Sequence, residues 1–173
     1  MIMRQHLVRA SLTLAFCLVA ILLLTPSIAS AASCISEDTG NWSGGFTCDG
    51  ILGQTPTSLD EVTILSGHDI IVDIDLAESG AITVQSGATL TIGPGYGFVS
   101  YGNVTVDGAL LGDNPSSHLN FLGTTFTNTG PGVSLDNVNF YATGPQTITG
   151  AGPWTGAGTL DIASESIVSL AND

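Results

Sequence analysis

The sequence has almost no positive charge. Only two of its 173 residues are Lys or Arg, and both of them, Arg4 and Arg9, lie at the start of the chain. Residues 32–173 contain neither Lys nor Arg but hold all 15 acidic residues. A surface without cationic side chains does not neutralise phosphates, which argues against a nucleic-acid partner. The same charge balance disfavours anionic lipids and acidic polysaccharides.

Long apolar runs are also scarce, and the single clear one lies at Leu12–Leu24, after the two arginines. Pro26 and the small residues Ala29-Ser30-Ala31 follow it, which is the order of a secretory signal peptide. We expect cleavage after Ala31, giving a secreted or cell-surface protein, with the bacterial periplasm as a further location. The run is shorter than the roughly 20 residues of a membrane span. A retained anchor and lipidation at Cys34 are the alternatives.

Cysteine is rare, and one of the three cysteines, Cys17, lies within the expected signal peptide. Cys34 and Cys48 remain, an even pair in an oxidising compartment, and they predict a disulfide worth about 3 kcal/mol in the chain-entropy model. No His or second Cys pair stands at zinc-ligand spacing. Two independent thiols are the alternative to the disulfide.

No amphipathic helix is evident beyond residue 31, and the hydrophobic pattern has a period of two, typical of strands. Gly, Pro, Asn and Asp separate the predicted strands, which are Val62–Leu65, Asp69–Leu76, Ala81–Gln85, Thr89–Ile92, Val104–Asp107, His118–Leu122, Val133–Phe140, Gln146–Thr149, Thr159–Ile162 and Ser166–Leu170. The chain is therefore predicted to be all-β.

Pairs of apolar residues recur along these strands, as Ile70/Val72/Ile74, Ile82/Val84, Leu90/Ile92, Val104/Val106, Leu119/Phe121, Val133/Leu135 and Leu160/Ile162. The loose repeat and the glycine corners, such as Ser86-Gly87-Ala88 and Asp107-Gly108-Ala109, favour a short right-handed parallel β-helix over the alternative, a β-sandwich. We expect residues 32–59, with the cysteine pair, to form an N-terminal cap. Residues 60–173 would then form five or six coils of roughly 20 residues each.

The last predicted strand, Ser166–Leu170, lies close to Asp173 without an evident cap. Either it belongs to a longer solenoid or its edge pairs with another chain, which would allow self-association. Alternatively, the charges of Asp161, Glu165 and Asp173 blunt that edge.

Two segments carry a family resemblance. Trp42, Gly44-Gly45, Pro56 and the stretch DEVTILSGHDIIVD at 60–73 resemble the opening of secreted β-helix proteins, including the extracellular domain named for its eight glycines. The stretch ITVQSGATLTI at 82–92 looks like the coil that follows there and in haemagglutinin-like adhesins. The resemblance implies a right-handed β-helix on a cell surface, as a module of an adhesin. The chain lacks the long repeat array and the sorting motif or terminal membrane barrel of such proteins.

Candidate chemistry is limited to Asp69, Asp73 and Asp75, which share a parity on one predicted strand beside His68. Asp73 and Asp75 would lie about 7 Å apart, a separation suited to a water molecule or a weak Ca²⁺ site. A solvated outer face is the simpler interpretation. A carbohydrate-active enzyme would need such converging carboxylates, whereas a lyase of this shape would need an Arg or Lys base. We predict no other cofactor.

Outward threonine pairs recur as Thr89/Thr91, Thr125/Thr127 and Thr147/Thr149. Stacked Thr-x-Thr rows are typical of β-solenoid ice-binding proteins, although Thr also suits any exposed strand face. The sequence thus favours an exported, non-enzymatic β-solenoid that serves as a structural or adhesive surface element, with a glycan or a surface protein as its partner. A carbohydrate-active enzyme and an ice-binding protein are the alternatives.

Overall fold

The computed structural model describes residues 30–156, 159–163 and 167–170. Residues Ala31–Asp173 form one compact unit, and the expected signal peptide lies almost entirely outside the described residues. Within the described part of the chain, no helix has the length and apolar character needed to cross a membrane.

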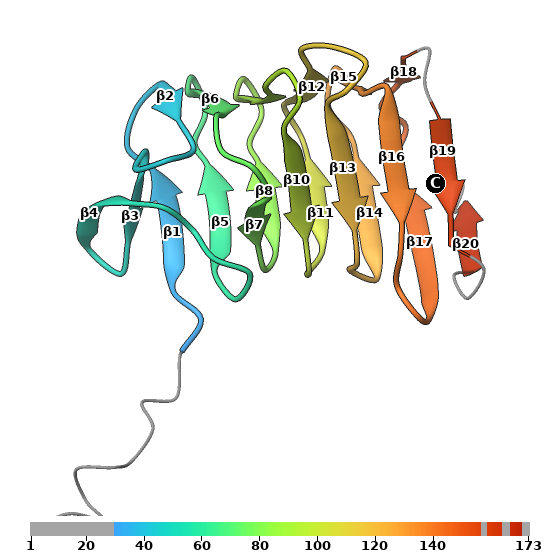
Figure 1. Ribbon diagram of the computed structural model, residues 1–173, viewed down its shortest axis with the longest axis horizontal. Helices are drawn as coiled ribbons and strands as arrows, with labels where there is room; N and C mark the ends of the chain where they lie inside the picture. The colour runs from blue at the N-terminus through green and yellow to red at the C-terminus, as the bar shows by residue number, and fades with distance from the viewer. Residues whose placement is uncertain (1–29, 157–158, 164–166, 171–173) are drawn as a thin grey trace, which may run out of the picture. The chain divides into compact units, whose positions relative to one another are not determined.

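The described chain is all-β and winds into a parallel β-solenoid of about five turns, so the predicted fold class is confirmed (Figure 1). Three sheets run along the solenoid, and successive turns lie side by side in each. Sheet A contains β1 (Ser33–Ser36), β3 (Phe46–Cys48), β4 (Ile51–Gln54), β5 (Glu61–Ile64), β8 (Ile82–Val84), β11 (Val104–Val106), β14 (Thr125–Asn128), β17 (Pro145–Thr149) and β20 (Ile167–Leu170). Sheet B contains β2 (Gly40–Asn41), β6 (Asp69–Val72), β9 (Thr89–Ile92), β12 (Ala109–Gly112), β15 (Gly132–Ser134) and β18 (Trp154–Thr155). Sheet C contains β7 (Ala77–Ser79), β10 (Gly97–Ser100), β13 (His118–Phe121), β16 (Asn137–Phe140) and β19 (Thr159–Ile162).

Each full turn contributes one strand to every sheet, and the register repeats like residues. Val104 pairs with Ile82 below it and with Phe126 above it, so apolar side chains stack on apolar side chains. Alternate residues of each strand point inward, which builds one continuous core that no single turn could bury alone. The predicted apolar pairs of β8, β9, β11 and β13 are all buried in it. Parallel pairing between successive turns is inconsistent with the alternative of a β-sandwich.

Glycine corners allow the turns to stack closely. Gly87 has a φ of 78°, a conformation that L side chains rarely adopt. Gly108 has no positive φ, but a Cβ there would lie 2.3 Å from the carbonyl oxygen of Ala88 in the turn below. The two corners singled out in the sequence thus require glycine for different reasons.

The N-terminal segment is more regular than the sequence suggested, because it contains four strands. β1 pairs in parallel with β5 and in antiparallel fashion with β3, so the ladder of sheet A begins before residue 60. Cys34 and Cys48 are register partners on β1 and β3, and they form the predicted disulfide. The Trp42 and Phe46 side chains are fully buried at this end of the core.

Two predicted strands were too long. The strand expected at Asp69–Leu76 ends at Val72, because the chain turns toward sheet C and Leu76 takes a positive φ of 54°. The strand expected at Val133–Phe140 is divided by a corner into β15 and β16. The inward positions expected for Leu160 and Ile162 are also not buried, with 56% and 43% of the side chains exposed.

Candidate functional site

A ladder of threonines runs along the outer face of sheet A. Successive strands place Thr63 beside Thr83, Thr83 beside Thr105, Thr105 beside Thr127 and Thr127 beside Thr149 in direct register. All five side chains are half-buried and alternate with core residues along their strands. We call these five residues the threonine ladder. Only Thr127 and Thr149 belong to Thr-x-Thr pairs noted in the sequence, because single threonines carry no such signal.

A second outward column lies beside the threonine ladder, one pleat away. In the later turns it contains Thr125 and Thr147, which pair with each other, and Ser169, which pairs with Thr147. In the earlier turns the corresponding outward positions are Glu61, Ala81 and Asn103. Glu61 is the sole carboxylate among the outward residues of β5, β8, β11, β14 and β17. The face formed by the two columns, called the sheet A face below, is therefore short-chained, polar and almost uncharged.

The predicted single row of three Thr-x-Thr pairs does not form. Thr125/Thr127 and Thr147/Thr149 stack on each other in sheet A. Thr89 and Thr91 lie on sheet B instead, between Asp69/Ile71 and Ala109/Leu111. Sequence spacing alone did not reveal which of the three sheets each pair would join.

Asn103 fixes the backbone that leads into the later turns of this face. Its Oδ1 accepts hydrogen bonds from the Thr124 amide at 3.3 Å, the Thr124 hydroxyl at 3.0 Å and the Thr125 amide at 3.0 Å. One side chain therefore holds the corner of the following turn in register with its own.

The acidic residues predicted to form a site do not share a strand face. Asp69 lies on β6, but Asp73 and Asp75 lie in the turn after it, so the assumed alternation does not extend to them. The Asp73 carboxylate accepts hydrogen bonds from the amide of Ser43, at 2.9 Å, and from its hydroxyl. No cluster of three or more His, Cys, Asp or Glu residues suited to a metal occurs within the described ranges. A weak calcium site at Asp73 and Asp75 stays a prediction.

His68, which the sequence placed beside these acids, makes a structural contact. Its Nδ1 lies 2.7 Å from the hydroxyl of Ser36, which also accepts the amide hydrogen of Leu65 at 2.9 Å. Because the Ser36 side chain is only 1% exposed, a substrate has no access to this hydroxyl. The Ser–His pair joins the first turn to the second.

Several other carboxylates also accept hydrogen bonds from the backbone of neighbouring segments. Asp60 accepts hydrogen bonds from the amide of Ala32 and from the amide and hydroxyl of Thr57, each at 2.8 Å. Burial alone would raise the pKa of Asp60, but these hydrogen bonds outweigh it and hold the pKa below its ordinary value. Glu37 similarly accepts from the Gly53 amide, and Asp49 from the Ser33 amide. These acids stabilise the N-terminal turns and do not converge on a common point.

One further acid perturbs a tyrosine on the outer surface. The Tyr101 hydroxyl lies 3.2 Å from Oε1 of Glu78, one turn below. This hydrogen bond, together with the negative charge of Glu78, raises the pKa of Tyr101. Both side chains face solvent, so the pair forms no enclosed site.

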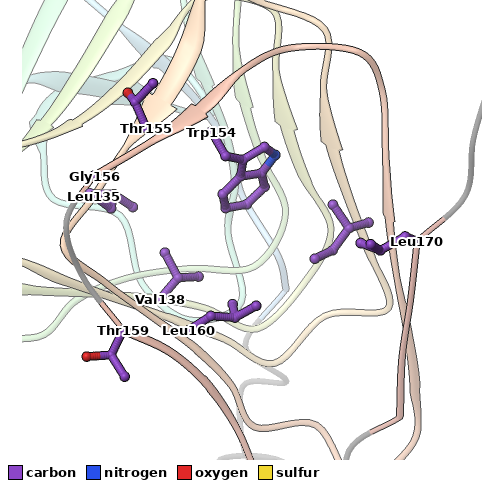
Figure 2. Close-up of a pocket in the computed structure, with 9 residues that line it drawn as sticks. Leu135, Val138, Trp154, Thr155, Gly156, Thr159, Leu160 and Leu170 are labelled. Carbon is purple, nitrogen blue, oxygen red and sulfur yellow. The ribbon is translucent and has the colours of Figure 1, made fainter.

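A cavity of about 370 Å³ lies at the end of the core beside β18 and β19. Figure 2 shows the side chains of Trp154, Val138 and Leu160 arranged around it. The complete lining is Leu135, Val138, Ile148, Trp154, Thr155, Gly156, Thr159, Leu160 and Leu170. None of these groups is ionisable, so the cavity offers apolar contact and no acid–base group.

The fold and these surfaces define a parallel β-solenoid with one long, nearly uncharged polar face. No protein-family model, curated protein or solved structure matches the chain. The resemblance to haemagglutinin-like adhesins and to the domain named for eight glycines therefore stays a prediction.

Proposed function

We propose that this protein is an exported β-solenoid that serves as a structural or adhesive surface element, and that it acts by contact and not by catalysis. The observation that carries the proposal is the sheet A face, a regular and almost uncharged polar surface on a strongly acidic protein. The in-register strands beneath it supply a rigid support, which lowers the entropic cost of binding an extended partner.

Export is supported by two features of this chain. Its N-terminal sequence has the order of a signal peptide. The disulfide between Cys34 and Cys48 suits an oxidising compartment outside the cytosol.

The acids support a structural role over an enzymatic one. A glycosidase brings two carboxylates within about 5 to 10 Å of each other across one groove. Here Asp60 and Asp73 are engaged with backbone amides and hydroxyls of neighbouring segments, and the cavity is lined by residues without ionisable groups.

The proposal is tested by retention of labelled residues 32–173, which are the compact unit without its first residue, on crystalline cellulose, chitin, immobilised glycans and a frozen water film. We expect retention on at least one surface. It should be lost in the double variant Thr105→Lys/Thr127→Lys, which places two long cations on the sheet A face. Thr91→Lys on sheet B is the matched control and should retain binding.

Polysaccharide turnover is measured on the same samples by release of reducing ends. We expect no turnover above buffer. Turnover at ordinary enzyme rates that disappears in Asp73→Asn/Asp75→Asn would establish an enzyme instead. Retention that is unchanged in the sheet A variants would exclude this face as the contact surface.

A further inference from the structure

We infer that the sheet A face binds the ordered water lattice of ice. The inference rests on the proposed function, because it assigns a ligand to the same contact surface.

The face repeats along the solenoid and, in its later turns, also from one column to the other. Along the solenoid, the threonine ladder places a hydroxyl and a methyl group at every turn, about 4.8 Å apart. Along each strand of the later turns, the two outward threonines are about 7 Å apart, as Thr125 and Thr127 are on β14 and Thr147 and Thr149 are on β17. The five rungs of the ladder span about 20 Å. A regular row of small polar groups, joined by a second row in the later turns, is suited to a partner that is itself a lattice.

The positions of these groups are strongly restrained. Threonine is β-branched, so few χ1 rotamers are open to it on a strand. Each ladder residue is half-buried, the three inner rungs Thr83, Thr105 and Thr127 lie between threonines, and each rung alternates with a core residue such as Val104 or Phe126. The hydroxyls and methyls are therefore held in place before the partner arrives, which reduces the ordering cost of binding.

The charge of the face indicates a neutral partner. The described outward residues of β8, β11, β14 and β17 carry no charge, although the chain from residue 32 onward holds 15 acids and no Lys or Arg. A cationic partner or a mineral would be met by carboxylates, and only Glu61, on β5, stands in these columns. Ice is uncharged and excludes ions, including the counterions of carboxylates. A face with almost no carboxylates therefore suits it.

The groups missing from the face argue against the other neutral partners. Protein partners are anchored by buried Trp, Tyr and Arg side chains that fill pockets. Sugar rings present apolar faces that suit aromatic side chains. Among the described residues, neither column contains an aromatic side chain or an arginine. A face with regularly spaced groups but no aromatic or arginine anchor binds through many weak contacts. The surface of an ice crystal offers such contacts at regular spacing.

The test is the partition of labelled residues 32–173 into slowly growing ice, beside an inert protein of similar size. We expect wild-type protein to be enriched in ice at least several-fold over the inert protein and to inhibit ice recrystallisation. Thr127→Lys and Thr105→Lys should each reduce the enrichment to the inert level. Thr91→Lys on sheet B should leave it unchanged, and circular dichroism checks that each variant is folded.

Thr127→Val and Thr127→Ser separate the two groups of the side chain without a long substituent. We expect both to reduce recrystallisation inhibition several-fold, because Val lacks the hydroxyl and Ser lacks the methyl. Folded wild-type protein that is excluded from ice as fully as the inert protein would overturn the inference. If that protein still binds cellulose or glycans through the sheet A face, the proposed adhesive function stands and only the ligand is wrong. If the sheet A variants alter neither, both proposals fail.

Discussion

The indole of Trp42 lies edge-on against the ring of Phe98, with 5.0 Å between the ring centroids. Trp42 belongs to the first turn, whereas Phe98 is on β10. In sheet C, Phe98 pairs with Ala77 of β7, whose buried side chain is small. Trp42 therefore reaches past the Ala77 level to Phe98 and, with Phe46 at 4.9 Å, closes the N-terminal end of the core.

Replacing Trp42 by Ala should remove this closure. The side chain is fully buried, so we expect a loss of about 3 to 5 kcal/mol in the free energy of unfolding, measured by urea denaturation. Trp42→Phe should cost less, because it keeps an aromatic ring and removes a buried indole N–H that has no hydrogen-bond partner. Leu52→Ala is the control. Leu52 is 70% exposed, and this variant should stay within about 0.5 kcal/mol of wild type. A loss equally small in Trp42→Ala would contradict the closing role.

The disulfide should stabilise the same end of the solenoid. Cys34 and Cys48 are separated by 14 positions, and closing a loop of that size is worth about 3 kcal/mol in the chain-entropy model. We expect Cys34→Ala/Cys48→Ala to lose about that much in urea denaturation, with a reductant producing a similar loss in wild type. The double variant should not respond to the reductant. A reductant effect of equal size in the double variant would show that another process is responsible.

The solenoid itself was predictable because its core follows local alternation. Pairs such as Val104/Val106 and Leu90/Ile92 repeat the same inward pattern in turn after turn, and a period of two is visible without knowledge of partners. The points at which strands end were less visible in the sequence. Nothing local in Asp69–Leu76 shows that the chain leaves sheet B after Val72, since Ile74 continues the alternation into the turn.

The sheet A face was predictable only in part. Two of the three predicted Thr-x-Thr pairs lie on it, but Thr63, Thr83 and Thr105 become significant only when the register places them in one column. The position of Asp73 was predicted wrongly for a related reason. Its carboxylate accepts a hydrogen bond from the amide of Ser43, 30 positions earlier, and no local pattern reveals that contact. Contacts between turns depend on the length of each coil, and the coils here vary: Leu90 is 20 positions from Leu110, which is 23 from Val133.

Asp60 should make the stability of the N-terminal turns depend on pH. The pKa of Asp60 in the folded protein lies below its ordinary value of 3.8. Its contribution is therefore present above that pH and is lost as the pH falls through the folded-state pKa. At neutral pH we expect Asp60→Asn to cost about 1 to 3 kcal/mol, because the hydrogen bonds to the charged carboxylate are weakened.

The Asp60 effect is isolated as the difference between wild type and Asp60→Asn in thermal unfolding from pH 7 to pH 3. That difference should shrink as the pH falls below 3.8 and through the lowered folded-state pKa, because the Asp60 carboxyl is then neutral, as the Asn side chain is at every pH. Asp113→Asn removes the same charge from an exposed turn and controls for the general relief of repulsion. A wild-type minus Asp60→Asn difference that grows on acidification would show the opposite sign of linkage and refute the assignment.

Salt should stabilise the protein, because residues 32–173 carry 15 acids and no Lys or Arg to pair with them. Screening then weakens repulsion without weakening ion pairs, so we expect the melting temperature to rise with NaCl and to rise less at pH 4. Calcium separates screening from binding. If Asp73 and Asp75 hold Ca²⁺, millimolar CaCl₂ should raise the melting temperature beyond NaCl of equal ionic strength, and Asp73→Asn/Asp75→Asn should abolish that excess. Equal shifts from the two salts in wild type would instead mean that these acids are only solvated.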